Sequence, residues 1–551
     1  MKPANDFSMF EYLKARDKGD NRPLISYYNN RIATNGFFSE VDKVANALYS
    51  MGLKAGDNIA LCLPNIPNAI VIFYAGNKLG IAINLIHPLV PTKALVETIE
   101  GLNSKAVFVL DSLYNAHRMK LKQLNVQTIV CKPSDYLKGI YKFGYDMYTR
   151  RKQPDLLEDE FALFYNDFIK NQTKIAPSRE HFEGIGEEIA AYIHSGGTTG
   201  IPKTAMIPNR ALNECSYSIR TLIGDEVEKG ESMLMVLPMF HIFGLGVCMH
   251  STLTAGARCI LVPIFKPKSL ARVVRREKAT YMTGVPSMYE KLAKVKRFGG
   301  RYLAKMKCCY CGGDKLKQEI KENFDKIMKK YNSSCTLCEG YGLTEAGVCN
   351  VNVEEIAKIS SVGRPLGDIK VCIVDNDKNK LENGERGEIC LSGDNLMSGY
   401  YNDPQTTEKA LFKDKDGVLW LATGDYGYLE DSGHLFFLDR LKRMIKISGM
   451  NVFPNEIEYL VGQEIKEIDR CCAVDYQKNG KPFIKLFVTM KEGYTYSALI
   501  EQRIRQTIKA NLMKYSLPKE IECVSELPLT AIGKVDYNKL KEKGVSSNDN
   551  Q

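Results

Sequence analysis

Short apolar runs alternate with longer segments of helical periodicity up to about Val371. The strand-like runs are Asn58–Leu63, Ala106–Leu110, Gln127–Val130, Ala190–Ile193, Arg258–Val262 and Ala279–Thr283. Between them, Asn68–Leu79 and Leu270–Glu277 repeat apolar residues every three or four positions, as amphipathic helices do. Strands that alternate with helices in this way predict an α/β fold with a mostly parallel sheet.

The pattern changes after Val371. Turn sequences such as Asn383-Gly384 and Asp416-Gly417 now separate short strands, which predicts a smaller antiparallel or mixed subdomain. The expected strands are Lys370–Val374, Gly387–Ser392 and His434–Leu438. Beyond Gly449 the pattern predicts an α+β region with a helix at Pro454–Val461, a strand at Ile484–Met490 and a helix at Ser497–Leu512. We expect the polar segment Lys541–Gln551 to be a frayed tail.

Composition narrows the class of protein. The chain has 551 residues, 44% of them hydrophobic and 25% charged, which excludes disordered, collagenous and disulfide-scaffold proteins. A net charge of +10 suits polyanionic ligands or an anionic lipid surface but is too small to indicate nucleic acid. The polar start of the chain predicts no signal peptide, and no apolar run is long enough to predict a transmembrane helix. The 16 cysteines are then expected to be reduced thiols of a cytoplasmic protein.

A glycine- and hydroxyl-rich loop follows the expected strand Ala190–Ile193. Residues 194–203 read HSGGTTGIPK, so free backbone N–H groups and hydroxyl donors are concentrated there, and consecutive amides form a nest for phosphate. A flexible surface turn is the alternative interpretation of the glycines alone. Pro202 before Lys203 excludes a Walker loop, which needs GK[ST] at the start of a helix. The candidate phosphate-binding residues are Ser195, Gly196, Gly197, Thr198, Thr199, Gly200 and Lys203.

This loop resembles the first signature of the adenylate-forming superfamily, [YF]TSGTTGxPKG. That superfamily contains acyl- and aryl-CoA synthetases, nonribosomal adenylation domains and luciferases, and the GGTTG variant is most similar to fatty acyl-CoA synthetases. His194 stands at the aromatic position of the signature, and Thr204 replaces its last glycine. The resemblance extends over about Ser39 to Leu540 through six or more motifs in the order of the family.

Three of these motifs precede Val371. LPMFHIFG resembles the segment that places a histidine, here His241, between nucleotide and acyl pocket. CGGD resembles a turn whose backbone passes beside adenine and the acyl chain, at Gly312, Gly313 and Asp314. GYGLTE matches the YGxTE motif, with Gly340, Tyr341, Gly342, Thr344 and Glu345. The resemblance assigns adenine stacking to Tyr341, an α-phosphate contact to Thr344 and Mg2+ to Glu345.

The remaining motifs lie near the C-terminus. Asp425 in TGD resembles the carboxylate that accepts hydrogen bonds from both ribose hydroxyls, and Arg440 resembles an arginine that contacts ribose and phosphate. Lys442 stands at the hinge position of the family and Lys446 near the adenylate, while Ser448 and Gly449 resemble a loop that lines the pantetheine tunnel. Lys534 in IGKVD resembles the lysine that bridges carboxylate and α-phosphate during adenylation.

The resemblance implies both architecture and activity. A large N-terminal adenylation domain (residues 1–438) would combine parallel sheets, helices and a small distorted β-barrel subdomain. A hinge (439–442) would join it to a mobile α+β C-terminal domain (443–551). The implied activity is that of an AMP-forming acid–thiol ligase that uses ATP, Mg2+ and CoA to activate a carboxylic acid, most simply a medium- or long-chain fatty acid. Its catalytic residues would be Lys534, Glu345, Thr344 and His241.

Other functions stay open. An aryl or bile acid would use the same pocket residues, and a separate carrier protein could replace CoA as the acyl acceptor. The two CxxC pairs Cys308/Cys311 and Cys335/Cys338 have the spacing of a four-cysteine zinc site, so a zinc-stabilised nucleotide-binding protein without catalysis is a further alternative. Residues i and i+3 of a strand point to opposite faces, which speaks against chelation if these pairs lie in strands.

Residues 132–152 interleave tyrosines and a phenylalanine with lysines and arginines. This composition suits a peripheral contact with an anionic membrane surface, for example at the inner face of the membrane. The alternative is a surface excursion whose rings pack on their own domain. Gly139 and Gly144 are expected to weaken any helix in this segment.

Overall fold

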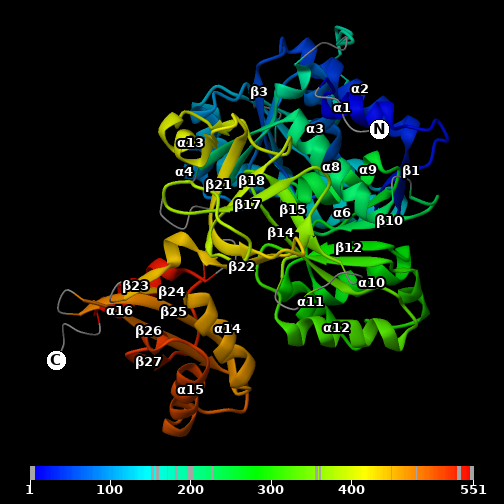
Figure 1. Cartoon of the computed structure of the whole chain (residues 1–551). Helices are drawn as coiled ribbons and strands as arrows, with labels where there is room; N and C mark the ends of the chain where they lie inside the picture. The colour runs from blue at the N-terminus through cyan, green and yellow to red at the C-terminus, as the bar shows by residue number, and fades with distance from the viewer. Residues whose placement is uncertain are drawn as a thin grey trace. The chain divides into compact units, whose positions relative to one another are not determined.

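The computed structural model describes residues 6–150, 154, 156, 160–170, 172–179, 184–195, 203–224, 227–353, 358, 361–447, 450–478, 481–529 and 535–546. The chain divides into two compact units (Figure 1). The first unit contains Met1–Ser195, Lys203–Lys370 and Ser392–Leu421, and the second is built mainly from Val371–Leu391 and Ala422–Gln551. Each unit is described on its own below.

An eight-stranded sheet forms one half of the first unit. In sheet order its strands are β19 (Gly399–Tyr400), β9 (Lys203–Pro208), β8 (Ile189–Ser195), β4 (Ala82–Leu85), β3 (Asn58–Cys62), β5 (Ala106–Leu110), β6 (Gln127–Cys131) and β7 (Ala162–Phe164). Strands β8 to β7 in this order run parallel, whereas β9 and β19 are antiparallel to their neighbours. The central strands are buried along almost their whole length, as continuous apolar runs in parallel sheets are.

A nine-stranded sheet forms the other half of the first unit. In sheet order it consists of β16 (Arg364–Pro365), β15 (Gly347–Asn352), β14 (Leu337–Leu343), β13 (Cys308–Cys311), β12 (Tyr281–Gly284), β10 (Ser232–Met235), β11 (Arg258–Leu261), β1 (Pro23–Tyr27) and β2 (Asn30–Ala33). The run from β14 to β1 is parallel, so the carboxyl ends of β12, β13 and β14 share one edge of the sheet.

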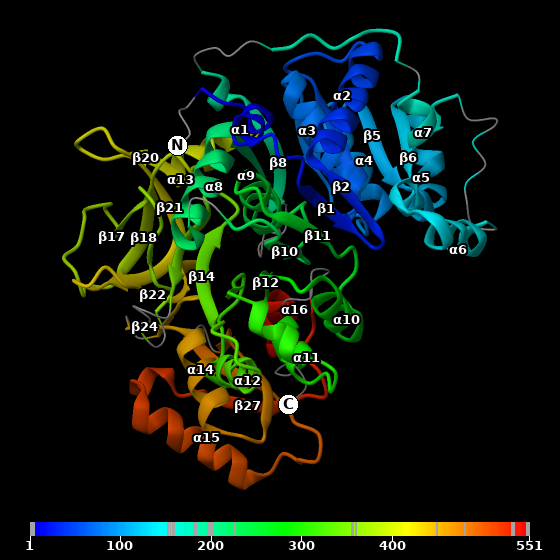
Figure 2. The ribbon, with the colours of Figure 1, turned by 90° about the vertical axis from the view of Figure 1, so that its right-hand side faces the viewer.

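Helices follow most of these strands and pack on the sheets (Figure 2). They are α1 (Met9–Ala15), α2 (Thr34–Ser50), α3 (Pro67–Leu79), α4 (Thr92–Gly101), α5 (Asp111–Gln123), α6 (Gly139–Thr149), α7 (Tyr165–Phe168), α8 (Asn209–Ile223), α9 (Thr252–Thr254), α10 (Pro267–Glu277), α11 (Pro286–Ala293), α12 (Gln318–Lys330) and α13 (Pro404–Ala410). A π-helix, Phe243–Ser251, leads into α9.

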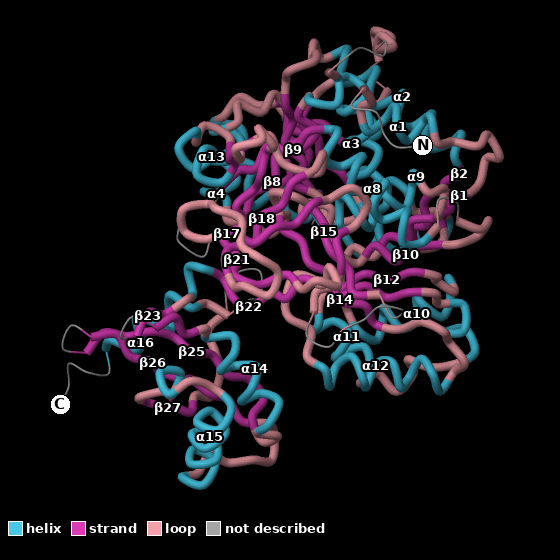
Figure 3. Tube along the Cα trace, viewed as in Figure 1, coloured by secondary structure: helices cyan, strands magenta, loops and turns pink. Residues whose placement is uncertain are grey.

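The second unit is an α+β structure (Figure 3). Strands β17 (Lys370–Val374), β18 (Gly387–Ser392) and β21 (Leu419–Leu429) are neighbours, and β22 (Leu435–Arg440) pairs with β21. The fifth strand of this sheet, β20 (Leu411–Lys413), belongs to the first unit and pairs with residues 419–421 at the start of β21. The remainder contains the hairpin β23 (Ile445–Ile447) and β24 (Met450–Val452), a sheet of β25 (Ile468–Lys478), β26 (Lys481–Met490) and β27 (Glu520–Cys523), and the helices α14 (Pro454–Glu464), α15 (Ala498–Asn511) and α16 (Tyr537–Ser546). Ile457, Leu486 and Ile504 lie at the centre of its apolar core.

The predicted α/β class and the parallel sheets are confirmed, and two local expectations are wrong. Residues 541–546 continue α16 instead of fraying, because Leu540 is fully buried and holds the helix on the core. Residues 139–149 form α6 despite two glycines: Gly139 has φ +52° and occupies the start of the helix, where a left-handed residue turns the chain, so only Gly144 lies in the interior. The hinge at 439–442 stays a prediction.

Candidate active site

Three predicted motifs meet at the carboxyl ends of parallel strands. CGGD follows β13, GYGLTE closes β14, and the segment after His241 begins the π-helix. A Cβ placed on Gly312 would lie 3.1 Å from Cε1 of Phe243 and 3.2 Å from the carbonyl oxygen of Gly340, so the Gly312 backbone lies against the Phe243 ring and the Gly340 backbone. A Cβ placed on Gly313 would lie 3.6 Å from Cγ1 of Val285, which follows β12. Ligand sites of α/β proteins are found at such strand ends.

Two glycines of this region cannot be replaced without moving the backbone. A Cβ on Gly244 would lie 2.0 Å from the carbonyl oxygen of Pro238, and one on Gly342 would lie 2.1 Å from that of Gly347. Glycine is therefore required by close backbone packing in LPMFHIFG and in GYGLTE. His241 itself is exposed at the start of this segment, and π-helical turns of this kind occur frequently at functional sites.

A tyrosine that the sequence did not single out joins two of the predicted motifs. Tyr400, in β19, donates a hydrogen bond of 2.8 Å from its hydroxyl to Oε1 of Glu345. The Nζ atom of Lys203 lies 4.8 Å from the centre of the same ring, within cation–π range. Lys203 from the glycine-rich loop and Glu345 from GYGLTE are thereby brought to one side chain. The only signal in the sequence was the adjacent pair Tyr400-Tyr401 after a glycine.

Two of the residues that depart from the superfamily signature are partners. His194 and Thr204 are directly opposite each other in the β8–β9 pair, and Nδ1 of His194 lies 3.0 Å from the Thr204 hydroxyl. Nε2 of His194 lies 2.7 Å from Oδ1 of Asn84, which is fully buried in β4. Burial lowers the pKa of His194 to about 4, so the imidazole is neutral at pH 7. This network joins three strands, β4, β8 and β9, and the glycine-rich loop connects the last two of them.

Tyr341, Thr344 and Asp314 occupy different environments. Tyr341 is only 8% exposed and lies in β14, where it is paired with Asn350 of β15. Thr344 is half-buried, and Asp314 is exposed. Glu339, directly before the motif, accepts a hydrogen bond of 2.9 Å from the Leu316 N–H, and burial raises its pKa to about 7.

In the second unit, the TGD turn is held by backbone contacts. The Thr423 hydroxyl donates to the Ile389 carbonyl oxygen at 2.7 Å and accepts from the Asp425 N–H at 3.0 Å. Gly424 has φ +70°, which a glycine tolerates. Asp425 is 1% exposed, and its Oδ1 lies 2.9 Å from Nε of Arg440. The two residues assigned to ribose therefore form an ion pair across β21 and β22.

The predicted hinge lies next to a buried charge network. Asp439 is fully buried and accepts a hydrogen bond of 2.8 Å from the Asn455 N–H. Arg443 pairs with Glu458 at 2.6 Å and lies 4.0 Å from the ring centre of Tyr537. Lys442 and Lys446 are exposed. The flanking side chains Asp439 and Arg443 are thus fixed while Lys442 is open to solvent.

Several predicted site residues lie outside the described part of the chain. They are Gly196, Gly197, Thr198, Thr199, Gly200, Ser448, Gly449 and Lys534, together with the side chain of Ser195.

The CxxC cysteines do not form one four-sulfur cluster among the described residues. The Cys308 thiol donates to the sulfur of Cys338 at 3.7 Å. The Cys335 thiol donates to a backbone carbonyl oxygen, and Cys309, which is outside both CxxC pairs, contacts the sulfur of Met306. In the described ranges no group of three or more His, Cys, Asp or Glu side chains is placed to hold a metal ion. All 16 cysteines are free thiols.

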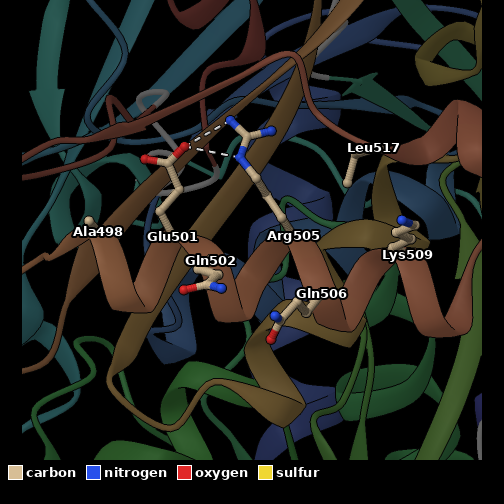
Figure 4. A pocket seen from close by; sticks show the side chains of 7 residues that line it. All are labelled: Ala498, Glu501, Gln502, Arg505, Gln506, Lys509 and Leu517. Atoms are coloured by element: carbon tan, nitrogen blue, oxygen red, sulfur yellow. Dashed lines mark hydrogen bonds and ion pairs between the residues drawn. The ribbon is translucent and has the colours of Figure 1, made fainter.

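A hollow along α15 is separate from all of these motifs. It is lined by one face of the helix, where Glu501 and Arg505 form an ion pair at 2.8 Å, and by Leu517 (Figure 4). None of its lining residues belongs to a predicted motif. Within the described ranges, no helix is both long and apolar enough to cross a bilayer.

Two family models match the chain. The model described as "AMP-binding enzyme" matches residues 13–401, and "AMP-binding enzyme C-terminal domain" matches residues 456–534. The first match alone covers most of the chain, and it contains the glycine-rich loop, LPMFHIFG, CGGD and GYGLTE.

Characterised families contain relatives that align with nearly the full length of this chain. The chain is 28% identical to a long-chain-fatty-acid–CoA ligase of Bacillus subtilis over 95% of this chain and 92% of the relative. It is 27% identical to a probable 4-coumarate–CoA ligase of Dictyostelium discoideum over 91% of this chain and 89% of the relative. Among solved structures, ATP-bound MatB from Rhodopseudomonas palustris has a TM-score of 0.81 at 21% identity, covering 98% of this chain and 99% of that one. A benzoate CoA ligase from Burkholderia xenovorans has a TM-score of 0.80 at 19% identity, covering 97% and 100%.

Proposed function

Since this chain belongs to the AMP-binding enzyme family of the adenylate-forming superfamily, we propose that it is an AMP-forming acid–CoA ligase whose substrate is a medium- or long-chain fatty acid. The observation that carries the proposal is the meeting of CGGD, GYGLTE and the His241 segment at one sheet edge, where Gly312 lies against Phe243 and Gly340. A nucleotide-binding turn and an acyl-lining segment are adjacent there, as the joining of an acid to AMP requires.

The first step joins two anionic partners. A carboxylate oxygen attacks the α-phosphorus of ATP, the bond to the bridging oxygen breaks, and pyrophosphate leaves. Donors placed before the reaction must offset the repulsion between the partners. We assign this role to the loop residues 195–200, to Lys203, to the Thr344 hydroxyl and to Lys534, with Asp425 and Arg440 binding the ribose.

Glu345 fits the role of a Mg2+ ligand. Its carboxylate is half-buried, and the hydrogen bond from Tyr400 engages Oε1, so the group is oriented and keeps a second oxygen for a cation. A hard carboxylate together with substrate phosphates is the usual environment of Mg2+. The ion would neutralise phosphate charge when bound, and Tyr400 would hold the carboxylate in position for it.

The second step uses the same carbonyl carbon. The CoA sulfur attacks it, the bond to the AMP oxygen breaks, AMP leaves, and the thiol proton passes to solvent. Lys534 and CoA would have to approach one carbonyl in turn. We propose that the region after the 439–442 hinge exchanges Lys534 for Lys446, Ser448 and Gly449 between the two steps.

The support for a fatty acid as the substrate comes from the relatives. One of nearly full length is named a long-chain-fatty-acid–CoA ligase. An acid with a long alkyl chain also partitions into lipid, so we propose that the enzyme meets it at a membrane surface.

The test is a screen for pyrophosphate release over fatty acids of 6 to 18 carbons, benzoate, 4-coumarate and cholate, each with and without CoA. We expect release with fatty acids, and acyl-CoA only when CoA is present. A preference for benzoate, 4-coumarate or cholate would overturn the substrate class. Pyrophosphate release without acyl-CoA would favour a carrier protein as the acceptor. No release with any acid, together with stoichiometric zinc, would favour the non-catalytic alternative.

A further inference from the structure

The outward side of α6 is apolar and exposed. Five large side chains of this 11-residue helix are open to solvent, with exposed fractions of 80% for Ile140, 47% for Tyr141, 67% for Phe143, 64% for Met147 and 75% for Tyr148. They recur at the three- and four-residue spacing of a single helix face. Soluble surfaces carry single exposed apolar residues, whereas a contiguous exposed face indicates an interaction site.

The opposite side of α6 is anchored to the first unit. Tyr145 donates a hydrogen bond to Asp111 at 3.3 Å, Thr149 is buried, and the Asn29 side chain donates to the Lys138 carbonyl oxygen at 2.9 Å. The preceding turn is also fixed, because Oδ2 of Asp135 accepts hydrogen bonds from the Lys132 N–H at 2.8 Å and from the Asn68 side chain at 3.0 Å. The apolar face is therefore presented by a docked helix, not by a loosely attached one.

Cations flank this face. Lys138 and Arg150 are the cap residues at the two ends of the helix, Lys142 lies on its polar side, and all three are exposed. The one carboxylate on that side, Asp146, is half-buried. A helix with an apolar face, aromatic residues and a basic polar side is the type that lies in the interface of a bilayer.

We propose that α6 is a membrane-docking helix that inserts Ile140, Phe143, Met147 and Tyr148 into the surface of an anionic lipid bilayer. The proposal deepens the function proposed above, since a fatty acid dissolved in lipid would reach the enzyme at that surface. Only the biological purpose of the docking rests on that function; the binding to lipid does not. At about 1.5 Å per residue the helix is about 16 Å long, so it lies on the bilayer and cannot span it. The basic residues favour an anionic lipid surface as the partner over an apolar protein surface, because the negative potential of the lipid surface attracts each nearby cation.

The test is co-sedimentation with vesicles of phosphatidylcholine alone and of phosphatidylcholine with 30% phosphatidylglycerol. We expect the full chain to bind the anionic vesicles and to be released by 0.5 M NaCl. Phe143→Ser with Met147→Ser should lower the partition coefficient at least about tenfold. The matched control is Ile264→Ser with Leu499→Ser, because these side chains are 67% and 65% exposed elsewhere and their replacement should leave binding unchanged.

A fluorescent reporter gives a second measurement. Trp420 is the single tryptophan of the chain and is only 4% exposed, so Phe143→Trp adds an emission that reports on α6. We expect a blue shift, and quenching by brominated lipid, when anionic vesicles are added. Lys138→Glu with Lys142→Glu and Arg150→Glu should lower anionic binding about tenfold or more.

Several results would overturn the proposal: no vesicle binding by the unaltered chain, binding that the α6 variants do not weaken, or an emission of the Phe143→Trp variant that lipid does not change. A dimer in sedimentation velocity that Phe143→Ser with Met147→Ser dissociates would show that a second copy covers this face instead. These assays contain no ATP or acid, so they do not depend on the proposed reaction. Pyrophosphate release with a water-soluble six-carbon acid should be unchanged in every α6 variant that retains its fold. If neither the unaltered chain nor any variant releases pyrophosphate, the proposed reaction is contradicted and the proposed lipid binding is not.

Discussion

The hydrogen bond from Tyr400 to Glu345 shows what one side chain contributes to the site. A carboxylate that holds a cation must be oriented, and a neighbouring donor fixes it more firmly than water does. We predict that Tyr400→Phe raises the Mg2+ concentration for half-maximal pyrophosphate release by about tenfold, because loss of a partner of a ligating group costs about 10- to 100-fold in metal affinity. The ring and its contact with Lys203 would remain.

The adjacent tyrosine provides the control. Tyr401 packs edge-on against Tyr192, with ring centres 5.5 Å apart, and its replacement by Phe should leave the Mg2+ dependence unchanged. Thermal unfolding of both variants separates a loss of fold from a loss of orientation. If Tyr400→Phe and the unaltered chain need the same Mg2+ concentration for half-maximal pyrophosphate release, Tyr400 does not position Glu345 for the cation.

Glu339 makes stability depend on pH. Burial raises its pKa in the folded state from 4.5 to about 7, so folding takes up a proton between these values. The contribution of the protonated group to stability, about 3 kcal/mol, is fully present below pH 4.5 and is lost as the pH rises through about 7. We predict that Glu339→Gln gains thermal stability relative to the unaltered chain as the pH rises from 5 to 8. A difference in midpoint that does not change with pH would contradict this prediction.

At the scale of elements, the contact between His194 and Thr204 joins β8 to β9 beside the glycine-rich loop. We predict that His194→Phe and Thr204→Gly, which restore the superfamily signature, each lower stability alone and are coupled by about 1 kcal/mol when combined, because the double variant leaves neither partner of their hydrogen bond unpaired. The measurement is a double-mutant cycle by thermal unfolding at pH 7.5. Additive effects would show that the two residues are independent.

The same network has a pH signature. Because the pKa of His194 is lowered from 6.5 to about 4 in the folded state, its contribution to stability is present above pH 6.5 and is lost as the pH falls towards 4. His194→Phe should therefore flatten the loss of stability between pH 6.5 and 4. His117, whose pKa is also lowered by burial, is the control histidine, and its hydrogen bond of 2.9 Å to Thr92 lies on α4 and α5, away from the loop.

The sequence predicted elements best where apolar residues repeat. β3, α3, β5 and α10 were found within a few residues because a buried run or a helical face determines each of them locally. It failed where distant contacts decide. Tyr400 matters through Glu345, 55 residues away, and α16 persists because Leu540 reaches a core formed by β25 and β26. In α6 the glycine count was misleading, since only the position and φ of Gly139 show that it starts the helix.

Within the motifs, the sequence identified candidate residues but not which of them contact each other. Cys308 and Cys311 have zinc-site spacing, yet the Cys308 sulfur contacts Cys338 diagonally across β13 and β14, because the register of that strand pair brings Tyr310 opposite Cys338. His194 and Thr204 looked like two separate departures from a signature. Only the β8–β9 register shows them as a pair.

At the scale of the whole molecule, the proposed reaction would require two arrangements of the C-terminal region. Lys534 is proposed to bridge carboxylate and α-phosphate in the first step, and it must withdraw when the CoA sulfur approaches the same carbonyl. We predict that Lys534→Ala lowers acyl-AMP formation by about 10²- to 10³-fold, as loss of one transition-state donor does, while supplied acyl-AMP is still converted to acyl-CoA. Lys509→Ala, on the exposed side of α15, is the matched control. Equal loss of both half-reactions would contradict the exchange of residues.

The hinge is tested by a variant that stops rotation without removing a ligand. Lys442 lies in the short 3₁₀ turn Leu441–Arg443, whose φ range suits proline, and thermal unfolding is the check that Lys442→Pro keeps its fold. Proline fixes φ at 442 and restricts Leu441 before it, while the buried contacts of Asp439 and Arg443 hold both sides. We predict that Lys442→Pro releases pyrophosphate normally with a fatty acid but forms acyl-CoA from supplied acyl-AMP at least about a hundredfold more slowly. Lys442→Ala is the control: it removes the charge but leaves the backbone free to rotate, so it should retain both steps. If Lys442→Pro forms acyl-CoA at the normal rate, the rotation does not pass through this residue.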